Sequence, residues 1–377
     1  MTQSPTLSRR QLLAGTLALA GAGRLRALAA QAPTPLDFTG RTGAELQALL
    51  DRASPGAVIV CKQAAPLVVR VSLVVRKPLT LRGLKADLPP KLGRVPVLIV
   101  EAKNVALADI EMHGNYDSVG PDDRAPFIWI KRGDFRVERC RFFDGTKDGL
   151  MITPEDGTED IVGGTIRDIE GVRMGRDLVS ISGGCKGLRV RQVTVENVRL
   201  VKGYGRGAVE VSDGTDEITA RRVYAEDAVY AFDVQDHRGP SAPNTRVTLE
   251  DATAVRCRHI LRTANSPQYK HADLTIRNFT GHDCQSPIQI KNTLRVRIDG
   301  LVITGTAAAN AVPIDLTNDH DVTMRNVSIA GLPEGSPVVR AVGCSNVRIE
   351  ALTLDGRPVT EPMITTAAAS TPKQKKS

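Results

Sequence analysis

Residues 209–235 read VEVSDGTDEITARRVYAEDAVYAFDVQ. The segment begins with a short strand pattern, VEVS, turns at Asp213-Gly214 into a longer alternating run, and ends with a second short strand, FDVQ. Alternation of apolar and polar residues is typical of a strand with one buried face, and Gly, Asp and Asn mark the turns between strands. One unit therefore holds a short strand and a longer strand, with no helix between them.

This unit recurs along most of the chain. Its short strands align at intervals of 22 to 30 residues, as FIWIK (127–131), LMIT (150–153), VSIS (179–182), VEVS (209–212), FDVQ (232–235), LRTA (261–264), IQIK (288–291), IDLT (314–317) and VRAV (339–342). A repeat of this period made only of strands is typical of a solenoid, in which each coil buries its apolar face against its neighbours. The alternative, a β-sandwich, would need hairpin turns and would not explain the steady repeat length.

Composition excludes some classes of function. Of 377 residues, 41% are hydrophobic and 24% are charged, which excludes a disordered or coiled-coil chain. Aromatic residues are only 3%, and this disfavours a nucleic-acid partner, since such modules commonly carry aromatic stacking platforms. The formal charge of +8 comes mostly from the termini, through Arg9, Arg10, Arg24, Arg26, Lys373, Lys375 and Lys376. The body is close to neutral, so no general attraction to polyanions follows.

The N-terminus indicates export. Ser8-Arg9-Arg10-Gln11-Leu12-Leu13 resembles the twin-arginine signal of bacteria, and a small-residue cleavage site follows at 27–29. Residues 1–30 are therefore expected to be a signal peptide, which implies the twin-arginine export machinery as a partner and a periplasmic or secreted protein. The apolar run from 12 to 23 is too short to span a bilayer, so no stable membrane insertion is expected. Residues 358–377 are expected to form a disordered basic tail.

The start of the mature chain carries a resemblance. A helical pattern at 43–53, with Thr42 as its N-cap, is followed by PGAVIVCKQ (55–63) and SLVVRKPLTLRG (72–83). This order resembles the N-terminal cap and first turns of the pectin-lyase-like superfamily, over residues 36–357. The resemblance implies an all-β, single-stranded right-handed parallel β-helix of about ten coils, in which the helix covers the open end. We expect a monomer with free, buried cysteines, namely Cys61, Cys140, Cys185, Cys257, Cys284 and Cys344.

The alignment predicts which side chains share a face. Alternate strand residues point to opposite sides, and the apolar set of each short strand must point inward. The residues between them form an outward column, Trp129, Met151, Ser180, Glu210, Asp233, Arg262, Gln289, Asp315 and Arg340. The middle coils thus bring together Glu210, Asp213, Asp233, Asp236 and His237 beside Arg262 and Lys291. These charges either form a salt-bridge ladder or a functional site. Like charges on adjacent coils, such as Glu210 and Asp233, favour a site.

Two chemistries suit carboxylates beside cations in a groove. In a uronate lyase, a metal ion or Arg neutralises the substrate carboxylate, and a base then removes the neighbouring C–H proton. The cluster is similar to calcium-assisted uronate lyases of the superfamily, which implies Ca²⁺ held by Glu210, Asp213, Asp233 and Asp236. Arg262, Lys291 and His237 would then supply neutraliser and base. No organic cofactor is expected.

The second chemistry is glycoside hydrolysis, with Asp233 paired with Glu210 or Asp236. The sequence lacks the paired-aspartate motif and Gly-His-Gly turn of polygalacturonases. A third option is uronate epimerisation, since residues 230–238 are similar to the Asp-Pro-His-Asp stretch of mannuronan epimerases, although the proline and the residue order differ. A non-catalytic, glycan-binding envelope protein is the alternative of another class. For a polysaccharide substrate, the expected binding residues are Trp129, Tyr230, His259, Asn265 and Gln289.

Overall fold

A computed structural model describes residues 34–90, 94–119, 125–154, 158–184, 186–237, 242–264, 271–306, 312–333, 335–359 and 364–367. Within them the chain is a parallel β-solenoid of about 11 turns, and the predicted fold class is confirmed. The predicted signal peptide lies outside the described residues, as do Cys185 and Asn265. The described part contains no helix long and apolar enough to cross a membrane.

One sheet consists of the short strands that the alignment predicted. Its neighbours pair in parallel from β4 to β29, in the order of the chain. The strands are β4 (Leu73–Val75), β7 (Leu98–Val100), β10 (Ile128–Ile130), β12 (Leu150–Ile152), β14 (Val179–Ser182), β16 (Val209–Ser212), β18 (Tyr230–Gln235), β20 (His259–Ala264), β22 (Ile288–Lys291), β24 (Ile314–Thr317), β26 (Val339–Val342) and β29 (Ile364–Ala367). We call it the short-strand sheet. β29 lies within residues 358–377, the segment expected to form a basic tail.

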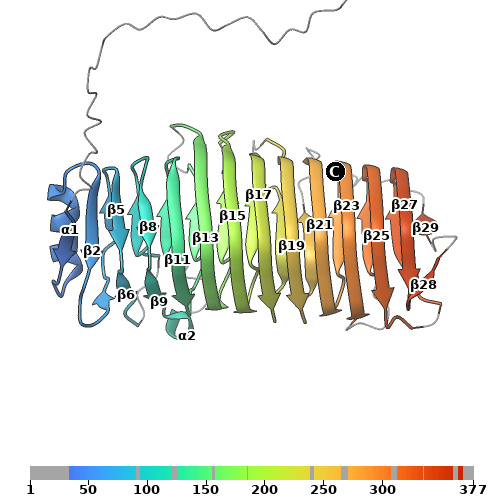
Figure 1. The fold of residues 1–377 in the computed structure, drawn as a ribbon, viewed down its shortest axis with the longest axis horizontal. Helices are drawn as coiled ribbons and strands as arrows, with labels where there is room; N and C mark the ends of the chain where they lie inside the picture. The colour runs from blue at the N-terminus through green and yellow to red at the C-terminus, as the bar shows by residue number, and fades with distance from the viewer. Residues whose placement is uncertain are drawn as a thin grey trace, which may run out of the picture. The chain divides into compact units, whose positions relative to one another are not determined.

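The longer strands form the rest of the solenoid wall and lie side by side in Figure 1. In the first coils they are split, as β1 (Leu36–Phe38), β2 (Ala57–Cys61), β3 (Leu67–Val68), β5 (Leu79–Arg82), β6 (Lys85–Asp87), β8 (Ala106–Ala108) and β9 (Glu111–His113). Later they are continuous, as β11 (Phe135–Phe143), β13 (Ile161–Met174), β15 (Val190–Gly203), β17 (Thr215–Glu226), β19 (Thr245–Val255), β21 (His271–Cys284), β23 (Thr293–Thr306), β25 (His320–Ala330) and β27 (Ser345–Leu354). β28 (Arg357–Pro358) pairs antiparallel with β27.

Each long strand is bent by residues with positive φ that stack from coil to coil. One such column is Asp168, Asn197, Arg222, Asp251 and Asn278, with φ between 54° and 58°. The strand register skips these positions, because Arg167 pairs with Glu196 and Ile169 pairs with Val198. Asp and Asn tolerate the left-handed region better than most residues. These bends let one continuous strand turn a corner of the coil.

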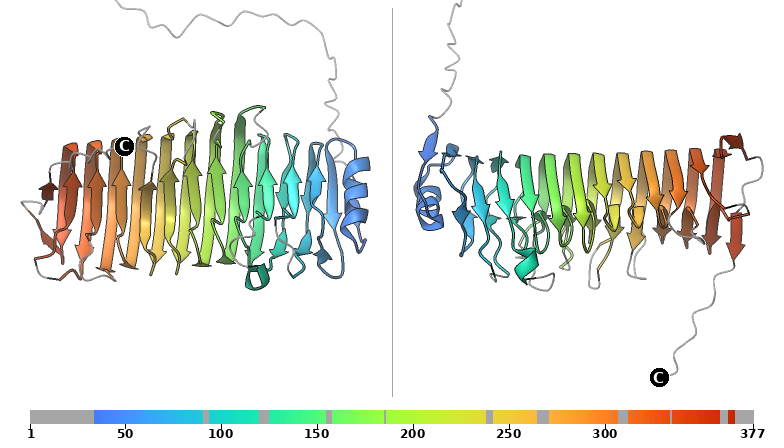
Figure 2. Two further views of the ribbon diagram at one scale, coloured as in Figure 1. Left: turned by 180° about the vertical axis from the view of Figure 1, so that it is seen from behind. Right: turned by 90° about the horizontal axis from the view of Figure 1, so that it is seen from below.

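The N-terminal helix α1 (Gly43–Arg52) covers the first coil, at one end of the stack in Figures 1 and 2. Its N-cap is Thr42, which forms a capping box with Glu45, as predicted for a helix starting there. Gln47 bonds the exposed edge of β4, since its side chain accepts from Val74 N at 2.7 Å and donates to Val74 O at 3.1 Å. The helix therefore supplies the hydrogen bonds that a preceding coil would give.

The solenoid interior is filled by aliphatic side chains and a few stacked aromatic rings, such as Phe232 on Phe279 at 5.5 Å. The five described cysteines are free, as expected. On the outer face of the long strands, charges alternate over nine coils, as Glu138, Arg167, Glu196, Arg221, Glu250, Arg277, Asp299, Arg325 and Glu350. Each arginine thus faces acids on both neighbouring coils. A shift of one strand along its neighbour would separate these pairs, so the charges favour the observed register.

Candidate functional site

The predicted outward column of the short-strand sheet is confirmed by the strand register. Ser180 pairs with Glu210, Glu210 with Asp233, and Asp233 with Arg262. The carboxylates are nevertheless buried, because Glu210 is 1% exposed and Asp233 is 0% exposed. They lie outside the apolar interior and beneath a polar cover. What covers them decides which groups can reach a substrate.

Asp233 is occupied by Arg262. The guanidinium donates to both carboxylate oxygens, with Nε 3.0 Å from Oδ1, and it also lies 5.0 Å from the centre of the Tyr230 ring. Burial raises the pKa of Asp233, although Arg262 opposes this rise. Burial alone would lower the pKa of Arg262, but the hydrogen bond to Asp233 and the charge of Asp233 together outweigh it, and the pKa is raised. Arg262 is therefore a poor base, and Asp233 has no oxygen free of this contact.

Glu210 is held from three sides. It accepts from Ser180 Oγ at 2.6 Å, from Arg206 Nη1 at 2.6 Å and from Gln235 Nε2. Arg176 Nη2 lies 3.8 Å from Glu210 Oε2, the oxygen that accepts from Ser180. Buried charges persist in proteins when they are paired in this way. Glu210 is the centre of a polar network and faces no open solvent.

Arg206 and Arg176 belong to a column that the sequence analysis missed. Arg176 N donates to Lys147 O, and the turn that follows carries Arg206, so Lys147, Arg176 and Arg206 precede three successive short strands. Two of them are followed directly by an acid, at Asp148 and Asp177. The repeated basic–acidic dipeptide ahead of a short strand is the signal that could have revealed this column.

Arg176 lies between three carboxylates without a close hydrogen bond to any. Its guanidinium nitrogens are 3.7 Å from Asp148, 3.8 Å from Asp177 and 3.8 Å from Glu210. Its side chain is 17% exposed, and Nε has no hydrogen-bond partner. Burial alone would lower its pKa, but the nearby carboxylates outweigh it and the pKa is raised. Arg176 therefore stays charged beside these carboxylates, and its unpartnered Nε is buried.

Asp177 and Tyr230 support this network from its buried side. The Tyr230 hydroxyl donates to Asp177 Oδ1 at 2.7 Å, and both side chains are fully buried. Burial, together with the charges of Glu210 and Asp148, raises the pKa of Asp177 well above its ordinary value. Burial also raises the pKa of Asp148. Tyr230 cannot touch a substrate in this arrangement, and its place is structural.

At the other end of the short strands, Asp213 holds His237. One carboxylate oxygen accepts from His237 N at 2.6 Å, and the other lies 2.6 Å from His237 Nδ1. Ser182 Oγ also donates to Asp213, at 3.0 Å. The hydrogen bond and the charge of Asp213 raise the pKa of His237. Burial alone would raise the pKa of Asp213, but its bonds to His237 outweigh that effect and lower it.

The turn that carries Asp213 is fixed by Asn244. Asp213 itself has φ of 55°, and Gly214 has φ of 90°. The buried Asn244 Oδ1 accepts from Gly214 N, Thr215 N and Thr215 Oγ, at 3.2, 3.0 and 2.7 Å. Asp213 is thus held rigidly in the turn, and it orients the His237 ring through two contacts.

These groups surround a cavity of about 320 Å³ on the outer face of the short-strand sheet. His237 stands at its rim, with a side chain that is 38% exposed. The other chemically active lining residues are Lys147, Asp148, Arg176, Ser180, Ser182, Lys186, Glu210, Ser212 and Asp213. The cavity combines a histidine oriented by a carboxylate with three cationic side chains. It is our candidate active site.

Several predicted residues lie outside this cavity. Asp236 accepts from Asn244 at 3.1 Å, and burial together with the charge of Asp213 raises its pKa to about 7. His259 is 3% exposed and bonds Ser286 O, and burial lowers its pKa to about 4. Gln289 and Lys291 lie on β22, beyond Arg262. Trp129 lies one coil before Met151, and its indole Nε1 donates to Thr153 O at 3.3 Å.

The calcium ion expected from the sequence does not fit this donor set. Glu210 and Asp233 direct their oxygens to guanidinium groups, and Asp213 directs both oxygens to His237. In the described residues, no group of three or more His, Cys, Asp or Glu side chains is arranged to hold a metal ion. Calcium requires several convergent oxygen ligands. We therefore derive no step through a metal.

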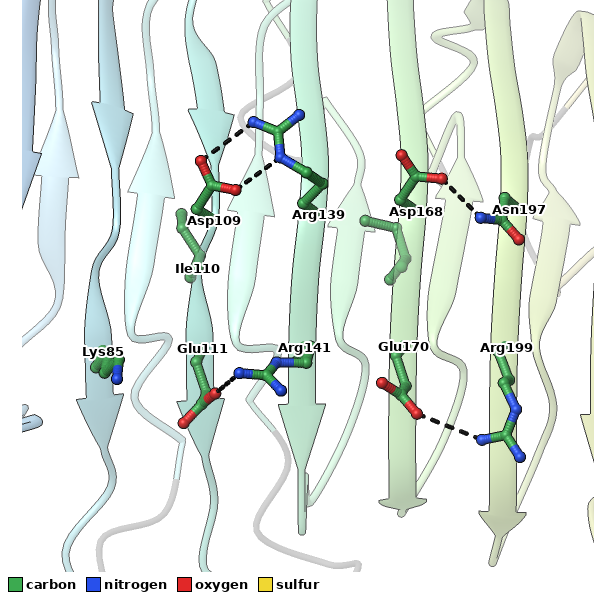
Figure 3. A pocket seen from close by; sticks show the side chains of 11 residues that line it. Lys85, Asp109, Ile110, Glu111, Arg139, Arg141, Asp168, Glu170, Asn197 and Arg199 are labelled. Carbon is green, nitrogen blue, oxygen red and sulfur yellow. Dashed lines mark hydrogen bonds and ion pairs between the residues drawn. The ribbon is translucent and has the colours of Figure 1, made fainter.

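A larger hollow, of about 500 Å³, lies on the long-strand face, and Figure 3 shows its lining. Most of its charged side chains, Lys85 apart, are paired across the coils. Arg139 bonds Asp109 at 2.6 Å, Asn197 bonds Asp168 at 2.6 Å, and Arg199 bonds Glu170 at 3.3 Å, while Glu111 bonds Arg141. Exposed pairs of this kind contribute little and offer no oriented catalytic group. The smaller cavity at His237 is the better candidate.

Comparison with known proteins identifies the fold. No protein-family model and no curated protein sequence matches this chain. Among solved structures, the mannuronan C-5 epimerase AlgE4 A-module of Azotobacter vinelandii has a TM-score of 0.59 at 12% identity, covering 89% of this chain and 97% of its own. The endo-xylogalacturonan hydrolase of Aspergillus tubingensis has a TM-score of 0.54 at 9% identity, covering 90% and 99%. An alginate lyase from Paenibacillus sp. strain FPU-7 has a TM-score of 0.50 at 13% identity, covering 76% and 98%.

At these identities the likeness shows the fold alone. The chain has the right-handed parallel β-helix architecture of pectin-lyase-like proteins, as the resemblance implied. The three similar structures carry the names of an epimerase, a hydrolase and a lyase, so the fold is compatible with all three reactions. The reaction must be inferred from the site of this chain.

Proposed function

We propose that this protein is an enzyme of acidic polysaccharides that removes the C5 proton of a uronate residue and cleaves the chain by β-elimination. The observation that carries the proposal is the Asp213–His237 pair, with both contacts at 2.6 Å, at the rim of a cavity lined by Lys147, Arg176 and Lys186. A base oriented by a carboxylate and cations for a substrate carboxylate are the two requirements of this chemistry.

His237 is suited to act as the base. Asp213 accepts the Nδ1 proton, and Gln235 Nε2 lies 3.4 Å from His237 Nε2 as a possible donor to its lone pair. Both contacts favour the neutral ring with its proton on Nδ1, which leaves Nε2 as the basic atom. Because Asp213 raises the pKa of His237, the basic form accumulates in a pH range above that of an ordinary histidine. Activity should therefore rise with pH through that range.

The reaction balances with the groups present. The substrate carboxylate binds to the cationic side of the cavity, which Lys147, Arg176 and Lys186 line. The C5–H bond breaks, its proton passes to His237 Nε2, and its electron pair forms a C4=C5 double bond. The C4–O bond breaks, and the leaving oxygen takes the proton back from His237 or from water. The products are a new reducing-end chain and an unsaturated uronate.

The test uses alginate, polygalacturonate and a neutral β-glucan, with formation of the unsaturated product followed by its ultraviolet absorbance. We expect turnover of an acidic polymer only, and a loss of about 10²- to 10⁴-fold in His237→Ala, as for removal of a general base. His282→Ala is the matched control, since His282 is exposed on the long strands and bonds Thr304. No absorbance change with any uronan, or full activity in His237→Ala, would refute the proposal.

Hydrolysis is the second candidate, and one observation favours it. Asp148 lines the cavity, and burial raises its pKa, as a general acid requires, while Glu210 lies near as a second carboxylate. Against it, both are only 1% exposed, whereas His237 is 38% exposed. New reducing ends without ultraviolet absorbance would support hydrolysis. Exchange of C5 hydrogen for deuterium without cleavage would instead indicate epimerisation.

A further inference from the structure

A pair of stacked tyrosines stands beside the candidate active site and takes no part in the chemistry above. The rings of Tyr116 and Tyr204 lie 4.8 Å apart between centroids, and their planes differ by 15°. Tyr204 is 49% exposed. Among the described residues it is the only tyrosine, phenylalanine or tryptophan that is exposed, while most of the others, such as Tyr230 and Phe232, are buried. What sets Tyr204 apart from a singly exposed ring is its stacking on Tyr116, which presents it as an aromatic surface for a ligand.

The pair is a built platform. Tyr116 begins the short helix α2 (Tyr116–Val119), which protrudes beside β11 in Figure 1. Arg173 bonds Asp144 and also contacts Asp117 of α2, with Nη1 3.5 Å from Oδ2. Tyr116 N donates to Asp144 O at 3.1 Å. These contacts attach α2 to the neighbouring coils, so the Tyr116 ring is a fixed support for the Tyr204 ring.

The platform is close to the cavity. Tyr204 N donates to Met174 O at 2.9 Å, and Arg176, which lines the cavity, is two residues after Met174. Two residues span at most about 7 Å. Tyr204 also precedes Arg206, the partner of Glu210, by two residues. The tyrosine pair therefore lies a short distance from the cavity, on the side where the polypeptide enters the short strands. A polymer bound in the cavity can reach it.

Tyr204 has one face on Tyr116 and remains 49% exposed. Sugar rings carry a face of C–H groups that packs well on an aromatic face, whose π electrons are partly negative. Tyrosine also offers its hydroxyl and, with two side-chain torsions, loses little entropy when it binds. Arg173, 38% exposed and beside Tyr204, adds a cation suited to an acidic sugar. The chemistry of the platform matches a uronate ring.

We propose that Tyr204, supported by Tyr116, is a second sugar-binding subsite. It holds the uronate unit of the polymer that is adjacent to the uronate unit bound in the cavity. The proposal rests on the proposed function for the identity of the sugar. It implies that the enzyme binds polymers more tightly than short oligosaccharides. It also implies that the subsite contributes to binding and not to the chemical step.

The first measurement is binding without turnover. In a His237→Ala background, we expect Tyr204→Ala to weaken binding of alginate or polygalacturonate about tenfold, the effect of one lost aromatic contact. Binding of the matching single uronic acid, which occupies the cavity alone, should not change. Tyr116→Ala should weaken polymer binding similarly, because the support is lost. Tyr224→Ala is the control, since Tyr224 is half-buried on the long strands beneath Arg199 at 5.3 Å.

The second measurement is steady-state kinetics of the active enzyme. Tyr204→Ala should raise KM for the polymer about tenfold and leave kcat unchanged. Polymer affinity equal to that of the parent, or an equal loss in Tyr224→Ala, would overturn the subsite while the lyase function stood. A wild-type protein that binds acidic polymers through Tyr204 but never turns them over would keep the subsite and refute the lyase. Circular dichroism detects a general unfolding of the variants. Tyr204→Phe keeps the aromatic ring and should retain binding.

Discussion

Replacement of Asp213 by asparagine tests the central pair of the site. Asn is nearly isosteric and tolerates the left-handed backbone of Asp213, whose φ is 55°, so the turn should persist. The negative charge is lost, and with it the charge-assisted bond to His237 Nδ1 at 2.6 Å. The amide can also offer its NH₂ group to Nδ1, which would place the histidine proton on Nε2 and remove the base.

The size of the effect follows from the contact that is lost. A hydrogen bond to a charged group contributes about 1.5 to 3 kcal/mol, which corresponds to about 10- to 150-fold in kcat/KM. The pH profile should change as well. Asp213 raises the pKa of His237, so its loss should move the acidic limb of the kcat/KM profile to lower pH. A variant that lost activity only through misfolding would not show this shift.

The control is Asp216→Asn, three residues further along the same turn and strand. Asp216 is 5% exposed and accepts from Thr245 Oγ at 2.7 Å and from Arg246, but it does not line the cavity. Its substitution should lower stability without moving the pH profile. The assay is initial rate against pH on the polymer that the wild type degrades. Wild-type kcat/KM and an unchanged acidic limb in Asp213→Asn would refute the role of the pair.

Three further outcomes are expected. Arg176→Ala should raise KM for an acidic polymer more than it lowers kcat, measured against Arg258→Ala, because Arg176 alone of the two lines the cavity. A chelator should leave activity unchanged, since the carboxylates are bonded to arginine and histidine, and a chelator-sensitive enzyme that calcium restores would contradict this arrangement. Arg221→Glu places three glutamates in a row with Glu196 and Glu250 and should lower the free energy of unfolding, measured in urea, by about 1 kcal/mol. The control Arg221→Gln should lower it less. Equal stability of the wild type and Arg221→Glu would show that the alternating charges of the long strands do not stabilise the register.

The fold could be predicted because its signal is repeated. Each short strand alternates, and residues such as Ile181 and Val211 must point inward, which also fixes the outward register of Ser180 and Glu210. The bends of the long strands could not be predicted in the same way. They place Arg222 and Gln192 at positive φ, where neither residue has a preference, because the stacked coils above and below impose the corner.

The candidate site was predicted only in part. The carboxylates and His237 were found because they lie on short strands or directly after them, where the period reveals the face. Lys147, Arg176 and Arg206 were missed because they lie in the turns before the strands, where no alternation exists. Those turns also determine burial, so the alternation placed Glu210 and Asp233 in solvent, whereas arginines cover both.

The arginines that cover these carboxylates change what can be concluded about the binding of an acidic substrate. A count of formal charges around Arg176 finds three carboxylates, Asp148, Asp177 and Glu210, against Arg176 and Arg206, which would repel an acidic substrate. However, burial raises the pKa of Asp148 and Asp177 and shifts both toward the neutral acid, while the pKa of each arginine is raised and its charge is kept. Glu210, the third carboxylate, accepts a hydrogen bond from Arg206 at 2.6 Å and lies 3.8 Å from Arg176, so two guanidinium groups face it. The carboxylates around Arg176 therefore hold a cation that lines the cavity, and their number does not by itself speak against a uronate substrate.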